Sequence, residues 1–389
     1  MPAAEPGAPL AGVRVVDLTR LLPGAFATSL LVGLGADVVK VEDPRGGDGL
    51  RVTPPFTESG ESGVFVALCH GKRSVTLDLK SAAGREAFLA LVASADVLLD
   101  SFRPGVLDRL GLGAEALAAA NGALVHVSLT AYGDGGRAAL PGHDLNALSY
   151  AGVLGLSRGP DGMPPLPPVP VADFATGLHA ALAAVSGLRS AAGGTGFRAD
   201  VTMVDSALSF TPMAQGAVVA TGAPPPVPDA LTGGLGCYGV YRCADGLELA
   251  VGALEPQFFA RIAELVGEPD LAAAQYDVAG QDALHGRLVA LFAGRPRQDW
   301  LDLLEHDHTC VSPVRTVADA LADPDLRARG VTVDVPLADG STAVVGRSAA
   351  WAPAPPAPSR APGLGEHTDE VLGALGVDLA ALRAAGATA

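Results

Sequence analysis

Residues 13–41 read VRVVDLTRLLPGAFATSLLVGLGADVVKV, and this stretch decides the fold. Val13–Leu18 is rich in β-branched residues and predicts a strand, whereas the Ala- and Leu-rich run Gly24–Leu34 predicts a helix. Asp37–Val41 returns to the strand pattern. Two short strands joined by one helix predict a βαβ unit, in which the strands are parallel.

The same alternation continues outward to about residue 200. Later runs predict strands at Ser74–Leu79, Val97–Leu99 and Leu124–Ser128, a helix at Ala82–Ala93, a helical turn at Gly105–Leu110, a long helix at Phe174–Ser190 and a further helix over Asp200–Ala217. Such alternation is typical of an α/β fold with a parallel, doubly wound sheet. We assign residues 1–224 to this large domain.

A proline-rich stretch, Gly222–Pro228, marks a boundary, and a different pattern follows it. An Asp-Gly turn between two β-branched runs predicts a hairpin, and three helices are predicted after it. These elements are strands Gly239–Cys243 and Leu247–Val251, then helices Pro256–Val266, Asp282–Phe292 and Arg297–Glu305. Residues 225–325 therefore predict a smaller α+β domain, and residues 326–389 a C-terminal extension with helices at Asp369–Leu375 and Leu379–Ala385.

Charge and composition exclude several classes of function. The formal net charge is −16, so the chain is a poor match for DNA or RNA, although a few arginines suffice for an anionic small ligand. The four cysteines form no Cys-x-x-Cys pair, and we expect no metal site. The longest uncharged run, Leu21–Ala36, is shorter than a membrane span, and the N-terminus does not resemble a signal peptide. We therefore expect a cytoplasmic protein that spans no membrane.

Acid and base groups follow predicted strands, where α/β sheets place their ligands. His143 and Asp144 lie in a loop after the strand Leu124–Ser128, Asp173 directly precedes the long helix, and Glu255 follows the hairpin. Each has a structural alternative: Asp173 as a helix N-cap, Glu255 as a helix start before proline, and His143 as an ordinary surface histidine. An aspartate at a helix N-terminus would also be kept ionised by the helix dipole.

With these residues in view, the chain resembles the class III CoA-transferase (CaiB/BaiF) superfamily, and within it the α-methylacyl-CoA racemases. The matching stretches occur in order along nearly the whole chain. They are Leu10–Leu18, Leu34–Glu42, Gly71–Lys80, Phe102–Val106 and Leu364–Leu372.

The resemblance implies a Rossmann-like large domain completed by the C-terminal extension, a smaller domain, and a homodimer of two interlocked chains. It implies an acyl-CoA substrate, with no cofactor beyond the CoA moiety and no metal. Arg45, Lys72, Arg73 and Arg103 become candidates for the nucleotide phosphates, and Asp144 a further CoA-binding residue. Charge-assisted bonds to phosphate are the physical reason for the basic residues.

Three functions remain open. The racemase branch uses a histidine from a Gly-His-Asp loop, an aspartate, and a glutamate from a Glu-Pro-Gln-Phe segment, here His143, Asp173 and Glu255. Racemisation would pass through an enolate, with Glu255 of one chain paired to His143 of the other and enolate donors among the backbone N–H groups at the start of the Phe174 helix. The transferase branch uses the aspartate as nucleophile, and the third possibility is a non-catalytic acyl-CoA-binding protein.

One segment departs from the racemase pattern. Racemases commonly carry Gly-Gly-Ala-Pro-Phe-Tyr before the hairpin, whereas this chain has Gly233–Tyr238 as Gly-Gly-Leu-Gly-Cys-Tyr, preceded by Thr232 in place of an acidic residue. The resemblance places this segment near the acyl group, so the substrate side chain is left open.

Overall fold

The computed structural model describes residues 7–159 and 161–388. The chain forms two compact units. The first unit comprises the chain up to Val153, Pro167–Phe210 and Leu321 onward, and the second comprises Leu154–Leu166 and Thr211–Ala320. The chain thus passes between the units several times, and the C-terminal extension lies in the first unit.

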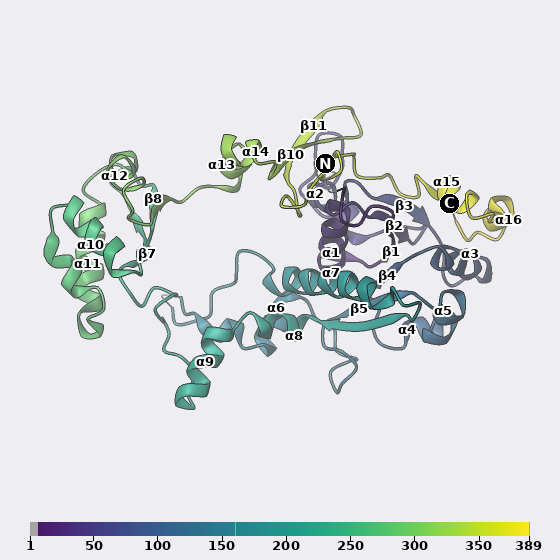
Figure 1. Cartoon of the computed structure of the whole chain (residues 1–389), viewed down its shortest axis with the longest axis horizontal. Coiled ribbons are helices and arrows are strands. Elements are labelled where there is room, and N and C mark those ends of the chain that lie inside the picture. The colour runs from purple at the N-terminus through teal and green to yellow at the C-terminus, as the bar shows by residue number, and fades with distance from the viewer. Residues whose placement is uncertain (1–6, 160, 389) are drawn as a thin grey trace, which may run out of the picture. The chain divides into compact units, whose positions relative to one another are not determined.

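A six-stranded parallel sheet is the centre of the first unit (Figure 1). Its strands, in the spatial order β3-β2-β1-β4-β5-β6, are Arg73–Thr76, Asp37–Glu42, Arg14–Leu18, Val97–Asp100, Val125–Thr130 and Phe197–Thr202. The predicted α/β fold with a parallel sheet is confirmed. This strand order is that of the Rossmann fold.

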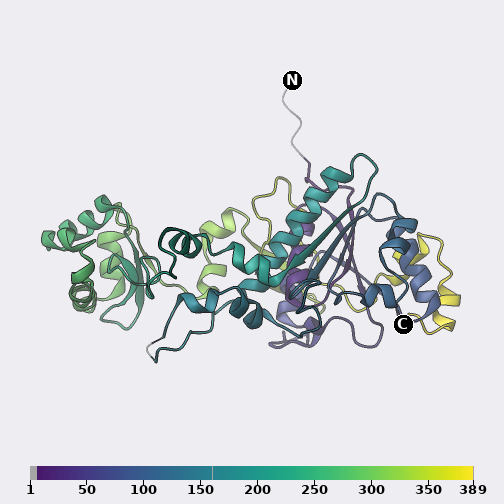
Figure 2. The same cartoon turned by 90° about the horizontal axis from the view of Figure 1, so that it is seen from below.

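Helices cover both faces of this sheet (Figures 1 and 2). On one face lie α1 (Leu21–Gly33) and α7 (Val171–Ala191), and on the other lie α3 (Ala82–Ala93) and α5 (Ala114–Ala120). Neighbouring strand residues point to opposite faces, so Val15 packs in the core under α1 and α7 and Val16 in the core under α3. Burial on both sides explains the short apolar runs Val15–Val16 in β1 and Val97–Leu99 in β4.

Close packing of α1 on α7 needs a glycine. A Cβ at Gly177 would lie 2.7 Å from the carbonyl oxygen of Pro23, so no larger residue fits there without a shift. By length and composition, α7 is also the one described helix that could cross a membrane, but its inner face packs against α1, β5 and β6.

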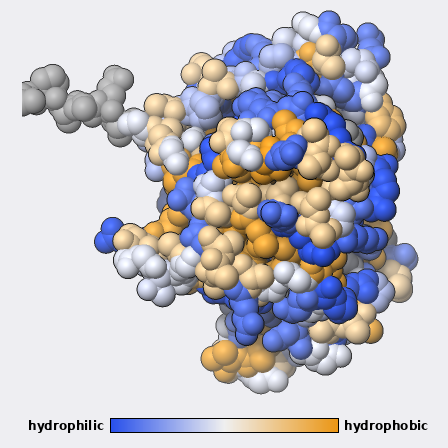
Figure 3. All heavy atoms as spheres, turned by 90° about the vertical axis from the view of Figure 1, so that its right-hand side faces the viewer, coloured by the Kyte–Doolittle hydropathy of each residue, from blue (hydrophilic) through white to orange (hydrophobic). Residues whose placement is uncertain are grey.

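The C-terminal segment packs against the edge strand β3. The His367 N–H donates to the Ser74 carbonyl at 2.8 Å, and the Thr76 N–H donates to Thr368 Oγ1 at 3.1 Å. Val371 packs into the core beside α3. On the face that carries this segment, Figure 3 shows hydrophobic residues gathered in patches that hydrophilic residues border.

Shorter elements complete the first unit and its boundaries. They are η1 (Gly49–Val52), α2 (Gly63–Cys69), α4 (Val106–Arg109), α6 (Asp144–Tyr150), η2 (Val153–Leu156), α8 (Met203–Ser209), α13 (Val317–Leu321), α14 (Pro324–Ala328), β10 (Thr332–Pro336), β11 (Thr342–Gly346), α15 (Thr368–Gly373) and α16 (Leu379–Ala384).

The second unit packs helices on a three-stranded antiparallel sheet. Its elements are α9 (Pro212–Thr221), β7 (Tyr238–Arg242), β8 (Glu248–Gly252), α10 (Pro256–Leu265), η3 (Pro269–Ala274), η4 (Val278–Gly280), α11 (Gln281–Phe292), α12 (Arg297–Leu304) and β9 (Val311–Pro313). Tyr241, Phe259, Phe292 and Trp300 fill its core. The predicted hairpin and the three helices after it are confirmed.

Several elements differ from the sequence prediction, and helices α2, α5 and α6 are among those that it missed. The helix expected over Asp200–Ala217 is wrong at its start, because Phe197–Thr202 forms the edge strand β6 and two separate helices, α8 and α9, follow. The alternating exposure of β6 is the period of a half-buried strand. The hairpin of β10 and β11 was not predicted either.

Candidate functional site

A pocket of about 410 Å³ opens at the carboxyl ends of β1, β4 and β5. The chain leaves β1 toward α1 on one face and β4 toward α5 on the other, so the pocket lies at the switch point where such sheets bind ligands. Its lining comes from the loops after these strands, from the loop before α6 and from the first turns of α7. Among the lining residues are Arg20, Ser101, Phe102, Arg103, Tyr132, Gly142, His143, Asp173 and Thr176.

The pocket brings together three of the residues predicted from sequence: His143, Asp173 and Arg103. A neighbouring pocket of about 270 Å³, at the ends of β1, β2 and β3, contains a fourth, Arg45. Glu255 belongs to the second unit, where it directly precedes α10 and its side chain makes no capping hydrogen bond. The predicted helix start before Pro256 is therefore confirmed, and the catalytic role of Glu255 stays a prediction.

Asp173 has an altered acidity. Its carboxylate is half-buried and accepts no hydrogen bond from the described residues. Burial, and secondly the negative charge of Asp144, raise the pKa of Asp173 to about 7. The group therefore does not stay fully ionised as the helix-dipole argument predicted. A carboxyl group with a pKa near neutrality can both take up and release a proton.

The N-terminus of α7 is capped by Asp144. The helix begins at Val171, so Asp173 lies in its first turn, and the N-cap role considered for Asp173 is wrong. Asp144 Oδ1 accepts the N–H groups of Ala172 at 2.6 Å and of Asp173 at 3.2 Å. These contacts tie the loop that carries His143 to the helix that carries Asp173.

The backbone N–H groups expected to donate to the enolate oxygen, at the start of the Phe174 helix, already have acceptors. The N–H groups of Ala172 and Asp173 are taken by Asp144, and the Phe174 N–H donates to the Pro170 carbonyl at 3.1 Å. The structure does not support these three groups as free donors toward the pocket.

His143 is exposed on the loop just before α6. Its backbone N–H donates to Asn146 Oδ1 at 3.1 Å, which ends the loop and starts the helix. The preceding Gly142 packs closely against Tyr132, because a Cβ there would lie 2.3 Å from the Tyr132 hydroxyl and the Tyr132 side chain would have to move. Tyr132, Gly142 and His143 line the pocket together.

Lys72 lies in the interior and not at the pocket. Its ammonium group has no exposed surface, donates to Thr28 Oγ1 at 2.6 Å and to the Ala25 carbonyl at 3.1 Å, and lies 3.6 Å from Asp17 Oδ2. A phosphate cannot reach it in this structure. The predicted phosphate role of Lys72 is corrected on that ground, because buried charges require a buried partner.

Arg73 is the first residue of β3, so it lies at the amino ends of the strands, whereas the pocket lies at their carboxyl ends. It is bound to Asp37 Oδ2 at 2.5 Å and to Glu370 Oε1 at 3.0 Å. These carboxylates use its guanidinium for structure, and the expected phosphate role is not supported.

Arg20 is a site residue that the sequence prediction missed. It directly follows the buried end of β1, is exposed, and lines both pockets. Its guanidinium lies 5.8 Å from the centre of the Phe102 ring. The rule that selected the other candidates, a polar residue after a parallel strand, would have found it.

Comparisons with known proteins identify the family of this chain. The model of CoA-transferase family III matches residues 10–368. The chain is 32% identical to succinyl-CoA:mesaconate CoA-transferase of Haloarcula marismortui, over 94% of this chain and 96% of that protein. It is 34% identical to the α-methylacyl-CoA racemase of Mus musculus, over 93% and 92%. A crystal structure of a CAIB/BAIF family protein from Brucella suis superposes with a TM-score of 0.82 at 32% identity, covering 95% of this chain and all of that one. The chain belongs to CoA-transferase family III, and the predicted family is confirmed.

Proposed function

We propose that this protein is a racemase or epimerase of 2-methylacyl-CoA thioesters, acting by 1,1-proton transfer through an enolate. The observation that carries the proposal is that His143 and Asp173 line one pocket, with the pKa of Asp173 raised to about 7. The α-proton of a thioester is weakly acidic, and inversion needs a base on one face of the carbon and an acid on the other. The racemases among the relatives support this choice.

In this mechanism one group of the pair removes the α-proton, leaving an enolate, and the other returns a proton to the opposite face. Either member can begin, so both enantiomers are substrates. Glu255 of one chain would pair with His143 of the other in an interlocked homodimer and hold its positive charge. The dimer and the Glu255 contact are parts of the proposal that rest on the family resemblance.

The CoA moiety would lie across the two pockets. Arg103 in the larger pocket and Arg45 in the smaller one supply cations for the nucleotide phosphates. Asp144 acts in this scheme through its bonds to α7 and not by touching CoA. The four cysteines are free thiols, in keeping with a cytoplasmic enzyme.

A second candidate function is CoA transfer between carboxylic acids. Two observations favour it: the Asp173 carboxylate accepts no hydrogen bond from the described residues, and several relatives are CoA-transferases. Asp173 would attack the thioester carbonyl, the C–S bond would break, and a mixed anhydride would form with release of CoA thiolate. The thiolate would then attack the aspartyl carbonyl, releasing the first acid and forming an enzyme–CoA thioester.

One experiment separates these functions. The protein is incubated with a single enantiomer of a 2-methylacyl-CoA in D2O, with a free carboxylic acid added in a parallel reaction. Gain of one deuterium with loss of optical purity establishes racemisation. No exchange, with CoA appearing on the added acid, establishes transfer. Binding of the thioester with neither reaction contradicts both functions for this acyl group, and the same result with thioesters of other acyl groups would identify a non-catalytic acyl-CoA-binding protein.

A further inference from the structure

We propose that Arg20 binds the phosphates of the nucleotide part of the substrate, and that a buried ionic clamp of Lys40 and Asp48 positions it for this task. The proposal rests on the acyl-CoA substrate proposed above and adds a specificity-determining residue to that site. Four residues line both pockets: Leu18, Arg20, Phe102 and Val106. Arg20 is the only charged one of these, so it stands where a ligand spanning the two pockets must pass.

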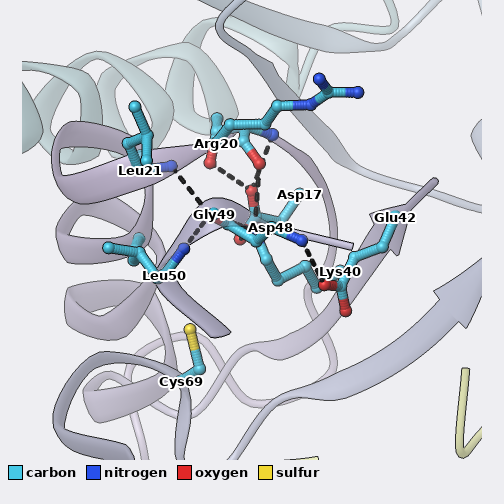
Figure 4. Close-up of polar contacts among 12 residues, drawn as sticks. Asp17, Arg20, Leu21, Lys40, Glu42, Asp48, Gly49, Leu50 and Cys69 are labelled. Carbon is cyan, nitrogen blue, oxygen red and sulfur yellow. Dashed lines mark hydrogen bonds and ion pairs between the residues drawn. The ribbon is translucent and has the colours of Figure 1, made fainter. Parts of the chain in front are cut away.

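The backbone on both sides of Arg20 is held by buried groups (Figure 4). Lys40 Nζ donates to the Thr19 carbonyl at 3.0 Å and lies 2.7 Å from Asp48 Oδ2. Asp48 Oδ1 in turn accepts the Leu21 N–H at 3.1 Å. The ion pair thus binds the backbone on both sides of Arg20: Lys40 binds Thr19, and Asp48 binds Leu21.

A further bond holds Arg20 itself. Its N–H donates to Ser101 Oγ, in the loop after β4, at 2.9 Å. In Figure 4 its side chain extends away from the buried cluster. The peptide is therefore anchored from β2, from the loop before η1 and from the loop after β4, while the guanidinium is left free.

The clamp maintains an unfavourable backbone conformation. Leu21 has φ +63°, in the left-handed region that a bulky non-glycine residue rarely adopts. Such a conformation persists only where surrounding contacts impose it, and it occurs preferentially at functional sites. Leu21 has 42% of its surface exposed, so packing of its side chain is a weak reason for the strain. The bond from its N–H to Asp48 is the stronger one.

The free guanidinium distinguishes Arg20 from Arg45. Arg45 already donates to both oxygens of Asp43 at 2.9 Å, whereas the Arg20 guanidinium makes no hydrogen bond to the described residues and interacts with Asp43 only through its charge. A planar guanidinium with unused donors matches a phosphate through two parallel bonds. The ligand feature recognised is therefore a phosphate on the nucleotide, which a pantetheine thioester lacks.

The first test compares Arg20→Ala with the wild type on two thioesters of one 2-methylacyl group, acyl-CoA and acyl-pantetheine. We expect kcat/KM for acyl-CoA to fall roughly 10- to 100-fold, mainly through KM, and kcat/KM for acyl-pantetheine to stay unchanged. Arg14→Ala is the matched control, because Arg14 begins the same strand at the opposite edge of the sheet. Equal losses on both substrates, or no loss on either, would overturn the proposal.

The second test addresses the hold on Arg20 through Ser101→Ala. This variant removes the hydroxyl that accepts the Arg20 N–H and leaves the ion pair of Lys40 and Asp48 in place. It should raise KM for acyl-CoA several-fold, with KM for acyl-pantetheine unchanged, because Arg20 is held less firmly. Unchanged KM values for both substrates would show that this anchoring is merely structural.

Calorimetric titration of CoA keeps this proposal separate from the proposed reaction. A wild-type protein that binds CoA but catalyses no proton exchange contradicts the racemase alone. An Arg20→Ala variant that binds CoA with wild-type affinity contradicts the role of Arg20 alone.

Discussion

Two groups of charged residues near the loop after β1 differ in whether their charges are paired. The buried group has almost no exposed side-chain surface, and each member lies within ion-pair distance of another; its members are Asp17, Lys40, Asp48 and Lys72. The second group, Arg20, Arg103 and Asp173, lines the pocket at the strand ends, and these side chains make no hydrogen bond to the described residues. A charge that the fold has both paired and buried is structural, whereas an exposed charge at the strand ends is available to a ligand.

The two groups also differ in the pKa of their aspartates, which is lowered for Asp17 and raised for Asp173. Burial alone would raise the pKa of Asp17, but the ammonium groups of Lys40 and Lys72 hold it below its usual value. Asp173 is also desolvated but has only a like charge nearby, so its pKa rises to about 7. Burial with a counter-ion keeps a carboxylate ionised, and burial without one makes it a group that can exchange protons.

The largest expected effect comes from removing the unpaired carboxylate. Asp173→Ala should lower both α-proton exchange and any CoA transfer by about 10⁴-fold, because both mechanisms need this group. The melting temperature should not fall, since the carboxylate bonds nothing in the fold. Isotope exchange and thermal melts of the same preparations check this. Full activity in the variant would show that Asp173 is not a catalytic residue.

His143→Ala should divide the two functions. Proton exchange should fall roughly 10²- to 10³-fold, because one of the two acid/base groups is lost. Transfer through Asp173 does not need His143 and should persist. Wild-type exchange in D2O would refute the racemase assignment.

Breaking the buried cluster should reduce stability instead of activity. Lys72→Met leaves Asp17 buried with one cation fewer, and the free energy of unfolding should drop by roughly 3–5 kcal/mol. The neighbouring Arg73→Met loses partly exposed ion pairs and should cost about 1 kcal/mol or less. Denaturant unfolding measures both. If Lys72→Met instead weakened CoA binding at full stability, the phosphate role first predicted for Lys72 would be restored.

The smallest effect is a pH dependence of stability. Because the pKa of Asp173 is about 7 in the folded protein and 3.8 ordinarily, the folded state binds the extra proton between these values. The contribution of Asp173 to stability should therefore fall as pH rises from about 4 to 7. Asp173→Asn removes this penalty, so it should be about 1–3 kcal/mol more stable than the wild type at pH 8, allowing for solvent screening, and equal to it near pH 4. Melting curves at both pH values check the sign, and a variant less stable at pH 8 would contradict the raised pKa.

Much of the large unit was predictable because its signals are local. The apolar runs of β1, β2 and β4 are continuous over a few residues, and the rule that ligands bind after parallel strands led to His143 and Asp173 without coordinates. The edge strand β6 was missed because its three apolar positions alternate with polar ones and the helix α8 follows it directly.

Tertiary structure alone decided which charges serve the fold. Lys72 and Arg73 are adjacent in sequence and both are positively charged. Lys72 is nevertheless paired with the buried Asp17, whereas Arg73 is paired with Asp37 at the surface. Asp144 caps a helix whose first residues lie 28 and 29 positions later. Local sequence determined the strands, the helices and the kinds of chemical group available, because backbone preference and hydrophobic period act over short spans. The partner and the burial of each charged group depend on residues far away in the chain, so only the folded structure could separate the residues of the site from the residues that support it.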